Sequence, residues 1–247
     1  MSDLGRLNVN EDFSHYKENR KQHAPLLNIP PVIIVIVSVC VLSFVIPEYF
    51  FSPRYYELFY IYFSFIPDFF THSSINFWYT PVSYSFLHAN IMHVGVNMMW
   101  LVIFGSPLAN RIGNIRFIVF WFICSAVAAF AHLFIYPDSY VPMVGASGAI
   151  SGMMGAASRY GFRQVRTFDE DRRSEFAGPI LSIGQSLTSR NVVGFIGTWI
   201  IIDVITGLAT PSMDGEGSSI AWVAHIGGLV AGFFLIGLFD KRRNQEI

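Results

Sequence analysis

Charged residues are scarce in this sequence of 247 residues. Asp, Glu, Lys and Arg make up only 13% of it and hydrophobic residues make up 53%, whereas a typical soluble domain carries about 25% charge. This composition excludes an ordinary soluble domain, and the long uncharged runs predict a protein that crosses a membrane several times. The formal net charge of −1 provides no basic surplus, so we expect no nucleic-acid partner.

Cysteine is also rare, because the chain has only two, Cys40 and Cys124. Both lie in apolar runs, so they are predicted to be small buried hydrophobic residues, not a disulfide or a metal site. The first apolar run begins near Ile29 and the residues before it are polar, which predicts no cleavable signal. We therefore expect residues 1–28 to form a polar cytoplasmic tail.

Six apolar segments are predicted to be transmembrane helices, since about 20 apolar residues span the hydrocarbon core of a bilayer. They comprise residues 31–46, 91–108, 117–135, 143–161, 192–208 and 220–239. A further stretch, residues 49–79, is dense in Tyr, Phe and Trp, and Pro53, Pro67 and Asp68 interrupt it. Because Tyr and Trp favour the headgroup level, we predict a partly helical loop at the outer interface. A broken seventh span is the alternative.

Basic residues mark every second link between these segments. They occur in the N-terminal tail, after residues 91–108, after residues 143–161 and in the C-terminal tail, whereas the other links contain only Arg54. By the positive-inside rule both termini are cytoplasmic. The prediction is an all-α membrane protein, a bundle of six transmembrane helices. Its core covers residues 29–240, between a polar tail at 1–28 and a basic tail at 241–247.

Small residues dominate positions 144–155, which read V-G-A-S-G-A-I-S-G-M-M-G. Small residues four positions apart let helices approach closely inside a membrane. Gly148 and Gly152 have this spacing, and Gly228 and Gly232 repeat it in the sixth segment. We therefore predict that the fourth and sixth helices pack tightly against each other.

Three polar residues are predicted to lie at one depth. His93, Ser147 and His225 lie near the starts of the second, fourth and sixth segments, which all run from outside to inside in this topology. Asn97 lies one helical turn below His93 on the same face. Polar groups inside a membrane are costly, so they usually line a cavity or bind each other. The pattern indicates a wet pocket open to the outside.

These side chains include the parts needed for nucleophilic catalysis. A serine hydroxyl needs a base to accept its proton, and tight packing of the two glycine-bearing helices would bring His225 to Ser147. His93 and Asn97 could then donate hydrogen bonds to an oxyanion. In the alternative interpretation, His93 and Asn97 bond across helices and His225 caps a carbonyl. We place no acidic residue or cysteine at this level, so we expect no metal.

Four other polar residues are given less direct roles. Asp203, in the fifth segment, approaches the same depth and could orient a histidine, but bonds to Ser, Thr or Trp neighbours are the favoured interpretation. His88 is expected to line the entrance of the pocket. His72 and His132 are expected to be structural.

Three motifs, in this order, resemble the rhomboid family of intramembrane serine proteases: H-A-N-I-M-H-V-G-V-N at 88–97, G-A-S-G at 145–148 and A-H-I-G-G-L-V-A-G at 224–232. The resemblance covers the six-helix core and implies a Ser147–His225 dyad that requires no third acid. It also implies that the backbone N–H of Ser147 helps to bind the oxyanion. The other residues of the implied oxyanion and substrate-binding site are His93, Asn97, Gly145 and Ala146.

By this resemblance the protein is a serine endopeptidase that cleaves transmembrane segments near the outer face, without a metal or a nucleotide cofactor. Its partners would be single-span or multi-span membrane proteins within the lipid bilayer. It would be a multi-pass protein of a bacterial inner membrane, with both termini cytoplasmic. A rhomboid-like binder that does not cleave and a small transporter are the alternatives. The sequence departs from the family in lacking a Trp-Arg pair in the first outer loop, and in having Ala109 where an acid often precedes the basic turn.

Overall fold

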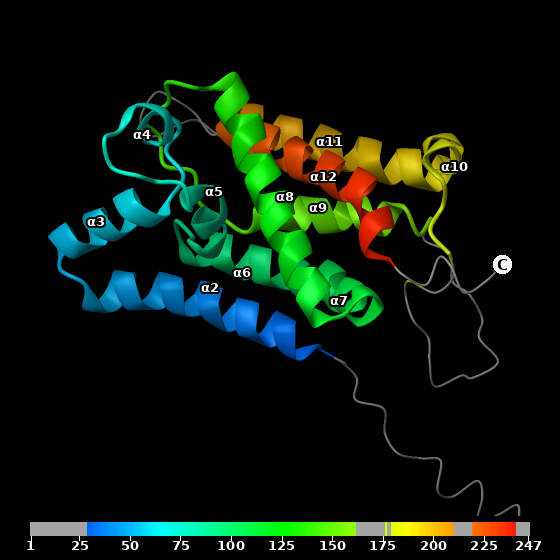
Figure 1. Cartoon of the computed structure of the whole chain (residues 1–247), viewed down its shortest axis with the longest axis horizontal. Helices are drawn as coiled ribbons and strands as arrows, with labels where there is room; N and C mark the ends of the chain where they lie inside the picture. The colour runs from blue at the N-terminus through cyan, green and yellow to red at the C-terminus, as the bar shows by residue number, and fades with distance from the viewer. Residues whose placement is uncertain (1–28, 162–175, 177–178, 210–218, 241–247) are drawn as a thin grey trace, which may run out of the picture.

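The computed structural model describes residues 29–161, 176, 179–209 and 219–240. Within these ranges the regular structure is helical, and the one β-type pairing is an antiparallel bridge between Phe65 and Met143. The predicted all-α fold class is confirmed (Figure 1). Both predicted tails, the link before the sixth helix and most of the charged segment after the fourth lie outside the described residues, so the predictions about them stay predictions.

The first helix and the aromatic segment fold largely as predicted. α2 begins at the predicted residue and continues past the predicted end at residue 46. Proline suits the first helical position because its fixed φ is already helical and its missing N–H has no acceptor there. The elements of this region are α2 (Pro31–Phe50), α3 (Pro53–Phe63), α4 (Pro67–His72), α5 (Thr80–Ser83) and the 3-10 turn η1 (Tyr84–Phe86). The aromatic segment is therefore partly helical, and its longest helix has 11 residues, too few for a seventh span.

The second apolar segment forms one continuous helix from Ile91 to Ile112. The Asn90 side chain caps its start by accepting a hydrogen bond from the backbone N–H of His93, with an N···O distance of 2.8 Å. Pro107 has no backbone N–H to donate to the carbonyl one turn earlier in the helix. A wider π-helical turn ends two residues before this proline. The parts are α6 (Ile91–Trp100), the π turn η2 (Leu101–Gly105) and α7 (Ser106–Ile112).

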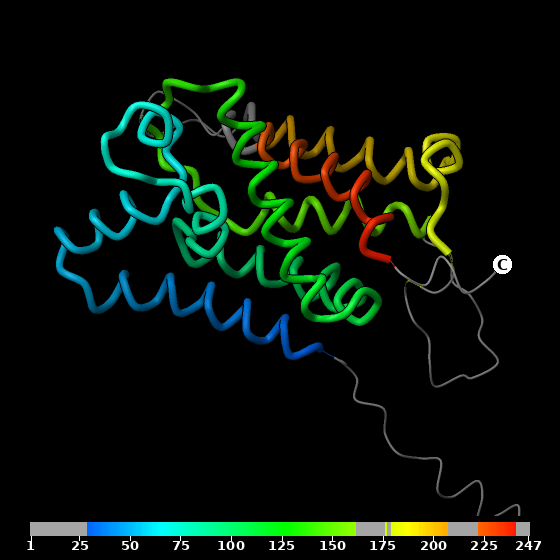
Figure 2. Tube along the Cα trace, viewed as in Figure 1, coloured from blue at the N-terminus to red at the C-terminus, as the bar shows by residue number. Residues whose placement is uncertain are grey.

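The remaining helices surround a short central one. They are α8 (Asn114–Ile135), α9 (Ser147–Ser158), α10 (Ile183–Thr188), α11 (Arg190–Ala209) and α12 (Ser219–Phe239). Every residue of α9 after Ser147 is buried, and α6, α8, α11 and α12 all pack against it. Figure 2 shows that α6, α9 and α12 run in the same direction, so their N-terminal ends lie at one end of the bundle. This places the predicted site residues at one depth.

α9 is shorter than the predicted segment 143–161. Met143 pairs with Phe65 in the isolated bridge, and Gly145 has a φ of 123°, which no right-handed helix contains. The helix therefore begins only at Ser147 and has 12 residues, about 18 Å of length.

Four helices in the described ranges are long and apolar enough to cross a membrane. They are α2, the continuous helix Ile91–Ile112, α8 and the part of α12 from Trp222 to Phe239. α9 is too short to be counted with them. The number of six spans therefore stays a prediction.

Glycine lets α9 and α12 approach backbone to backbone. A Cβ atom at Gly228 would overlap the carbonyl oxygen of Gly148, and one at Gly232 would overlap that of Gly152. Any larger residue at either position of α12 would push the two helices apart. The predicted tight packing of these two helices is confirmed.

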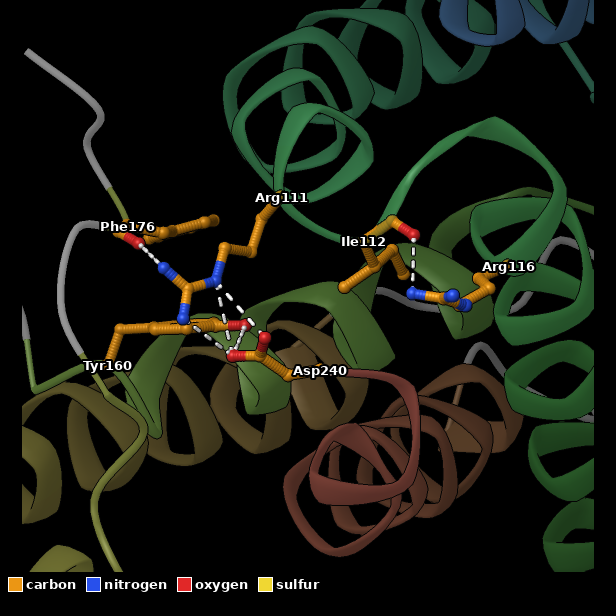
Figure 3. Close-up of polar contacts among 6 residues, drawn as sticks. All are labelled: Arg111, Ile112, Arg116, Tyr160, Phe176 and Asp240. Atoms are coloured by element: carbon orange, nitrogen blue, oxygen red, sulfur yellow. Dashed lines mark hydrogen bonds and ion pairs between the residues drawn. The ribbon is translucent and has the colours of Figure 1, made fainter. Parts of the chain in front are cut away.

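A buried ion pair joins the helix ends opposite to the predicted site (Figure 3). Arg111 of α7 contacts Asp240, which follows α12, with an N···O distance of 2.9 Å and side chains only 4% and 0% exposed. Arg111 also donates to the carbonyl of Phe176 at 3.1 Å, and the hydroxyl of Tyr160, just beyond α9, donates to Asp240 at 3.2 Å. One carboxylate thus holds together the ends of three helices.

Candidate active site

Ser147 is the first residue of α9, and the backbone before it explains its position. The positive φ of Gly145 turns the chain sharply, and the N–H of Gly145 donates to the carbonyl of Tyr84 at 3.1 Å. The first backbone N–H groups of a helix, including that of Ser147, have no acceptor within the helix and lie at the positive end of its dipole. The serine hydroxyl and a suitable donor for an anion therefore come from the same residue.

Gly145 also makes room between two of the predicted site residues. A Cβ atom there would lie 2.7 Å from Nε2 of His93 and 3.5 Å from Oγ of Ser147. These distances place the ring of His93 next to the turn that carries Ser147. Any side chain at position 145 would collide with this ring in addition to being strained by its φ.

His225 of α12 contacts Ser147 directly. The distance from its Nε2 to the serine Oγ is 2.7 Å, and the distance from its Nδ1 to Oδ1 of Asp203 is 2.5 Å. A carboxylate only accepts hydrogen bonds, so Nδ1 carries the proton of the neutral ring. Nε2 is then the acceptor, and the Ser147 hydroxyl donates to it. The structure thus brings together Ser147 and His225, as the sequence predicted.

The favoured interpretation of Asp203, that it bonds only to Ser, Thr or Trp neighbours, is wrong, because it bonds to His225. The statement that no acid lies at the level of Ser147 is wrong for the same reason. Sequence position gives the depth of a residue along α11 but not the direction in which its side chain points. One signal for this contact was present, since Asp203 is the one acid between Arg190 and Ala209.

Asn97 and His93 lie on α6 as predicted, but their hydrogen bonds are local. Asn97 is only 5% exposed, and its Nδ2 donates to the backbone carbonyl of His93 at 2.9 Å. An amide NH2 group has two hydrogens, so one stays available for a second acceptor. Among the described residues Asn97 makes no side-chain bond to another helix, and its predicted role as an oxyanion donor stays a prediction.

His88 does not line an entrance, because its side chain is fully buried. Its ring packs edge-on against His93 with the ring centroids 5.1 Å apart. Burial, and secondarily the nearby His93, lowers the pKa of His88 to about 3, so its ring is neutral. His132 is also buried, and His72 bonds to Asp68 in the aromatic segment at 3.1 Å, which fits the structural roles expected for both.

A family model described as the Rhomboid domain matches residues 76–242 of this chain. The chain belongs to the rhomboid family. The matched range contains α6, α9, α11 and α12, and so every candidate site residue described above. It leaves out most of the aromatic segment, which is where the sequence lacks the family's Trp-Arg pair. Together with the apolar helices, the match makes this an integral membrane protein.

Two curated rhomboid proteins are similar to this chain. The rhomboid protease GluP of Bacillus subtilis (strain 168) is 26% identical over 173 residues, which cover 67% of this chain and 28% of that protein. The rhomboid protease GlpG of Serratia proteamaculans (strain 568) is 26% identical over 165 residues, which cover 67% of this chain and 49% of that protein. The similarity thus spans half or less of the length of each relative.

Proposed function

We propose that this protein is an intramembrane serine protease that hydrolyses peptide bonds in the transmembrane segments of other membrane proteins. The observation that carries the proposal is the 2.7 Å contact between Oγ of Ser147 and Nε2 of His225 at the N-terminal end of α9. Membership of the rhomboid family and the two relatives named as proteases support it. Both side chains are partly exposed, so a peptide and water have access to them.

The reaction needs only side chains, backbone and water. Nε2 of His225 accepts the proton of Ser147 while Oγ attacks the carbonyl carbon of the peptide bond, which forms a tetrahedral intermediate. His225 then gives that proton to the nitrogen of the leaving amine, the C–N bond breaks and an acyl-enzyme remains. A water molecule, deprotonated by His225, hydrolyses the ester and restores the serine.

The negative oxygen of the intermediate needs donors, and three groups are candidates for this role. The backbone N–H of Ser147 lies at the helix N-terminus, where an anion is favoured. His93 lies beside Gly145, and Asn97 has one amide hydrogen beyond its bond to the His93 carbonyl. We assign His93 and Asn97 to the stabilisation of this oxygen, with Gly145 and Ala146 shaping the turn beside it.

The proposed orientation rests on the charge pattern of the sequence, and the proposed membrane rests on the resemblance to the rhomboid family. Both termini are cytoplasmic and the protein lies in a bacterial inner membrane, so that the Ser147 end of the bundle is near the outer face. Single-span or multi-span membrane proteins reach the serine from the lipid, and water reaches it from outside. The outer-face location rests on this topology.

The proposal is tested by cleavage of a panel of single-span membrane proteins in liposomes. Wild type is expected to cleave some of them, and Ser147→Ala none. Ser151→Ala is the matched control, because Ser151 lies one turn deeper on α9 and is buried, so this variant is expected to retain activity. Labelling by a fluorophosphonate separates a protease from a silent binder: labelling of wild type but not of Ser147→Ala supports the proposal. Cleavage by Ser147→Ala would overturn the assignment of the nucleophile.

A further inference from the structure

We propose that Asp203 is a positioning residue that completes a Ser147–His225–Asp203 triad. The inference rests on the proposed protease function and goes beyond the two-residue dyad that the family resemblance implies. Its basis is the 2.5 Å contact between Oδ1 of Asp203 and Nδ1 of His225, on the side of the ring opposite to Ser147.

The contact selects the form of His225 that can act as a base. A neutral imidazole carries its proton on either Nδ1 or Nε2, and only the first form leaves Nε2 free to accept a proton from Ser147. Because the carboxylate of Asp203 accepts but does not donate, it stabilises the Nδ1–H form and fixes the plane of the ring. Without it, the ring can rotate, and the Nε2–H form, which cannot accept the proton of Ser147, is populated as well.

The contact also stabilises the charge that forms during the reaction. The proton that leaves Oγ of Ser147 goes to Nε2, which makes His225 a cation, and it then leaves with the amine. Asp203 takes up no proton in either step. Its negative charge lies next to the imidazolium, and both side chains are largely buried, at 17% and 11% exposed, so the attraction is less screened than in bulk water.

Burial argues against a purely structural role for this acid. The side chain of Asp203 is 11% exposed, and its second oxygen, Oδ2, is buried with no hydrogen-bond partner among the described residues. The indole N–H of Trp199, one turn earlier on α11, is likewise without a partner there. A buried carboxylate with one oxygen unpaired is a costly way to stabilise a helix bundle. The bond that it does make goes to the general base.

The orientation of α11 is consistent with this role. Ile201, Ile202 and Ile205 around Asp203 are largely exposed, as expected for a face toward lipid. The single acid of the helix instead lies on the side that packs against α9 and α12. α11 therefore supplies the third side chain of a site whose other parts come from α9 and α12.

The test compares kcat and KM of wild type, Asp203→Asn and Asp203→Glu on a substrate found with the panel above. Asn preserves the size of the side chain but removes the charge and can donate to Nδ1, which favours the wrong tautomer. We expect kcat to fall on the order of 10²- to 10⁴-fold with KM nearly unchanged, the upper figure being that of a soluble serine protease with this triad. Glu restores a carboxylate, so we expect kcat of Asp203→Glu to be at least about tenfold higher than kcat of Asp203→Asn.

Asp68→Asn is the matched control. Asp68 also bonds to a histidine Nδ1, that of His72 at 3.1 Å, but the side chain of this histidine is 61% exposed and lies in the aromatic segment. The same substitution there is expected to leave kcat within about twofold of wild type. Thermal melting of each variant checks that it is folded.

A proton NMR spectrum of wild type with 15N-labelled histidine gives a readout that does not depend on activity. A short bond from Nδ1–H to a carboxylate moves the resonance of this proton far downfield, and we expect it in wild type and not in Asp203→Asn. Its absence in wild type, or a kcat of Asp203→Asn within threefold of wild type, would overturn the role of Asp203 while cleavage by wild type upholds the protease. A higher KM with unchanged kcat would also overturn it. A wild type that cleaves nothing would reject the proposed function itself.

Discussion

The residues around Ser147 differ in what their removal should cost. His225→Ala is expected to be as inactive as Ser147→Ala, because a nucleophile and its base act as a unit. Asn97 only donates to charge that develops in the transition state, so Asn97→Ala should lower kcat by about 10²- to 10³-fold, or about 3–4 kcal/mol, and spare KM. We expect His93→Ala to resemble Asn97→Ala.

Measuring kcat and KM for these four variants in one detergent checks this assignment. Ser151→Ala serves again as the folded, active reference. If His93→Ala were inactive while His225→Ala retained activity, the roles of the two histidines would have to be exchanged.

Buried His88 predicts that acid weakens the fold. Burial, and then the charge of His93, lowers the pKa of His88 from 6.5 to about 3. As the pH falls below 6.5, the unfolded chain binds a proton that the folded protein excludes, so stability present above pH 6.5 is lost progressively toward pH 3. Between pH 7 and pH 5 this loss amounts to about 2 kcal/mol.

His88→Gln should therefore show a smaller drop in Tm between pH 7 and pH 5 than wild type, whatever its Tm at pH 7. Equal drops for wild type and His88→Gln would mean that His88 is not the group that excludes the proton.

The sequence predicted which residues lie at one depth better than it predicted which way they point. Depth follows from counting along a helix of known direction, which is why His93, Ser147 and His225 were placed correctly. The rotation of a helix about its axis is set by packing against all its neighbours. This is why Asp203, which faces His225, was misjudged. His88 was misjudged for another reason: it lies in the loop before α6, and counting along a helix does not give the path of a loop.

At the level of helices, the contact between α9 and α12 should tolerate no added atom. In Gly232→Ala the new methyl group overlaps the carbonyl oxygen of Gly152, so we expect a loss of stability of at least about 1–3 kcal/mol. Activity should fall too, because α12 carries His225. Titration of purified protein with a denaturing detergent measures the change.

Gly194→Ala on α11 is the control, because a Cβ atom there meets nothing within 4 Å. Alanine favours a helix over glycine by up to about 1 kcal/mol, so this variant should be as stable as wild type or more so. If Gly232→Ala were equally stable, close packing of the two backbones would not be what holds these helices together.

The pairing of these two helices could be predicted because the spacing of four residues between glycines has a direct geometric meaning. The start of α9 could not be predicted as well. It depends on the positive φ of Gly145 and on the bridge between Met143 and Phe65, a contact between residues far apart in the sequence.

For the molecule as a whole, the ion pair of Arg111 and Asp240 should contribute to stability without contributing to catalysis. Asp240→Asn leaves the buried guanidinium without its counter-charge, which we expect to cost about 3–5 kcal/mol. The pair lies beyond the C-terminal end of α9, about 18 Å along that helix from Ser147, so kcat of the folded fraction should not change.

Thermal melting and kcat of the same preparation check this expectation. Arg116→Gln removes a cation from the same end of the bundle, one that donates to the carbonyl of Ile112 at 3.4 Å (Figure 3), and should alter Tm little. A large fall in kcat of folded Asp240→Asn would contradict this expectation, because it would mean that the ion pair affects the site at the other end of the bundle.

The orientation of the whole protein is open to a separate test. Reporter proteins fused at Asp214, which lies outside the described residues, and at the C-terminus should report opposite sides of the membrane, because only the second site follows a basic stretch. Reporters on the same side would contradict the alternating topology and, with it, the placing of Ser147 near the outer face.

The three side chains of the proposed triad come from α9, α11 and α12, and α12 is the last helix of the described chain. A ribosome makes these helices in that order, so the growing chain contains Ser147 before His225 has been synthesised. Under the proposed mechanism the nascent protein therefore cannot cleave the insertion machinery or the other membrane proteins that this machinery inserts. It becomes able to cut only when α12 has been made and has packed against α9.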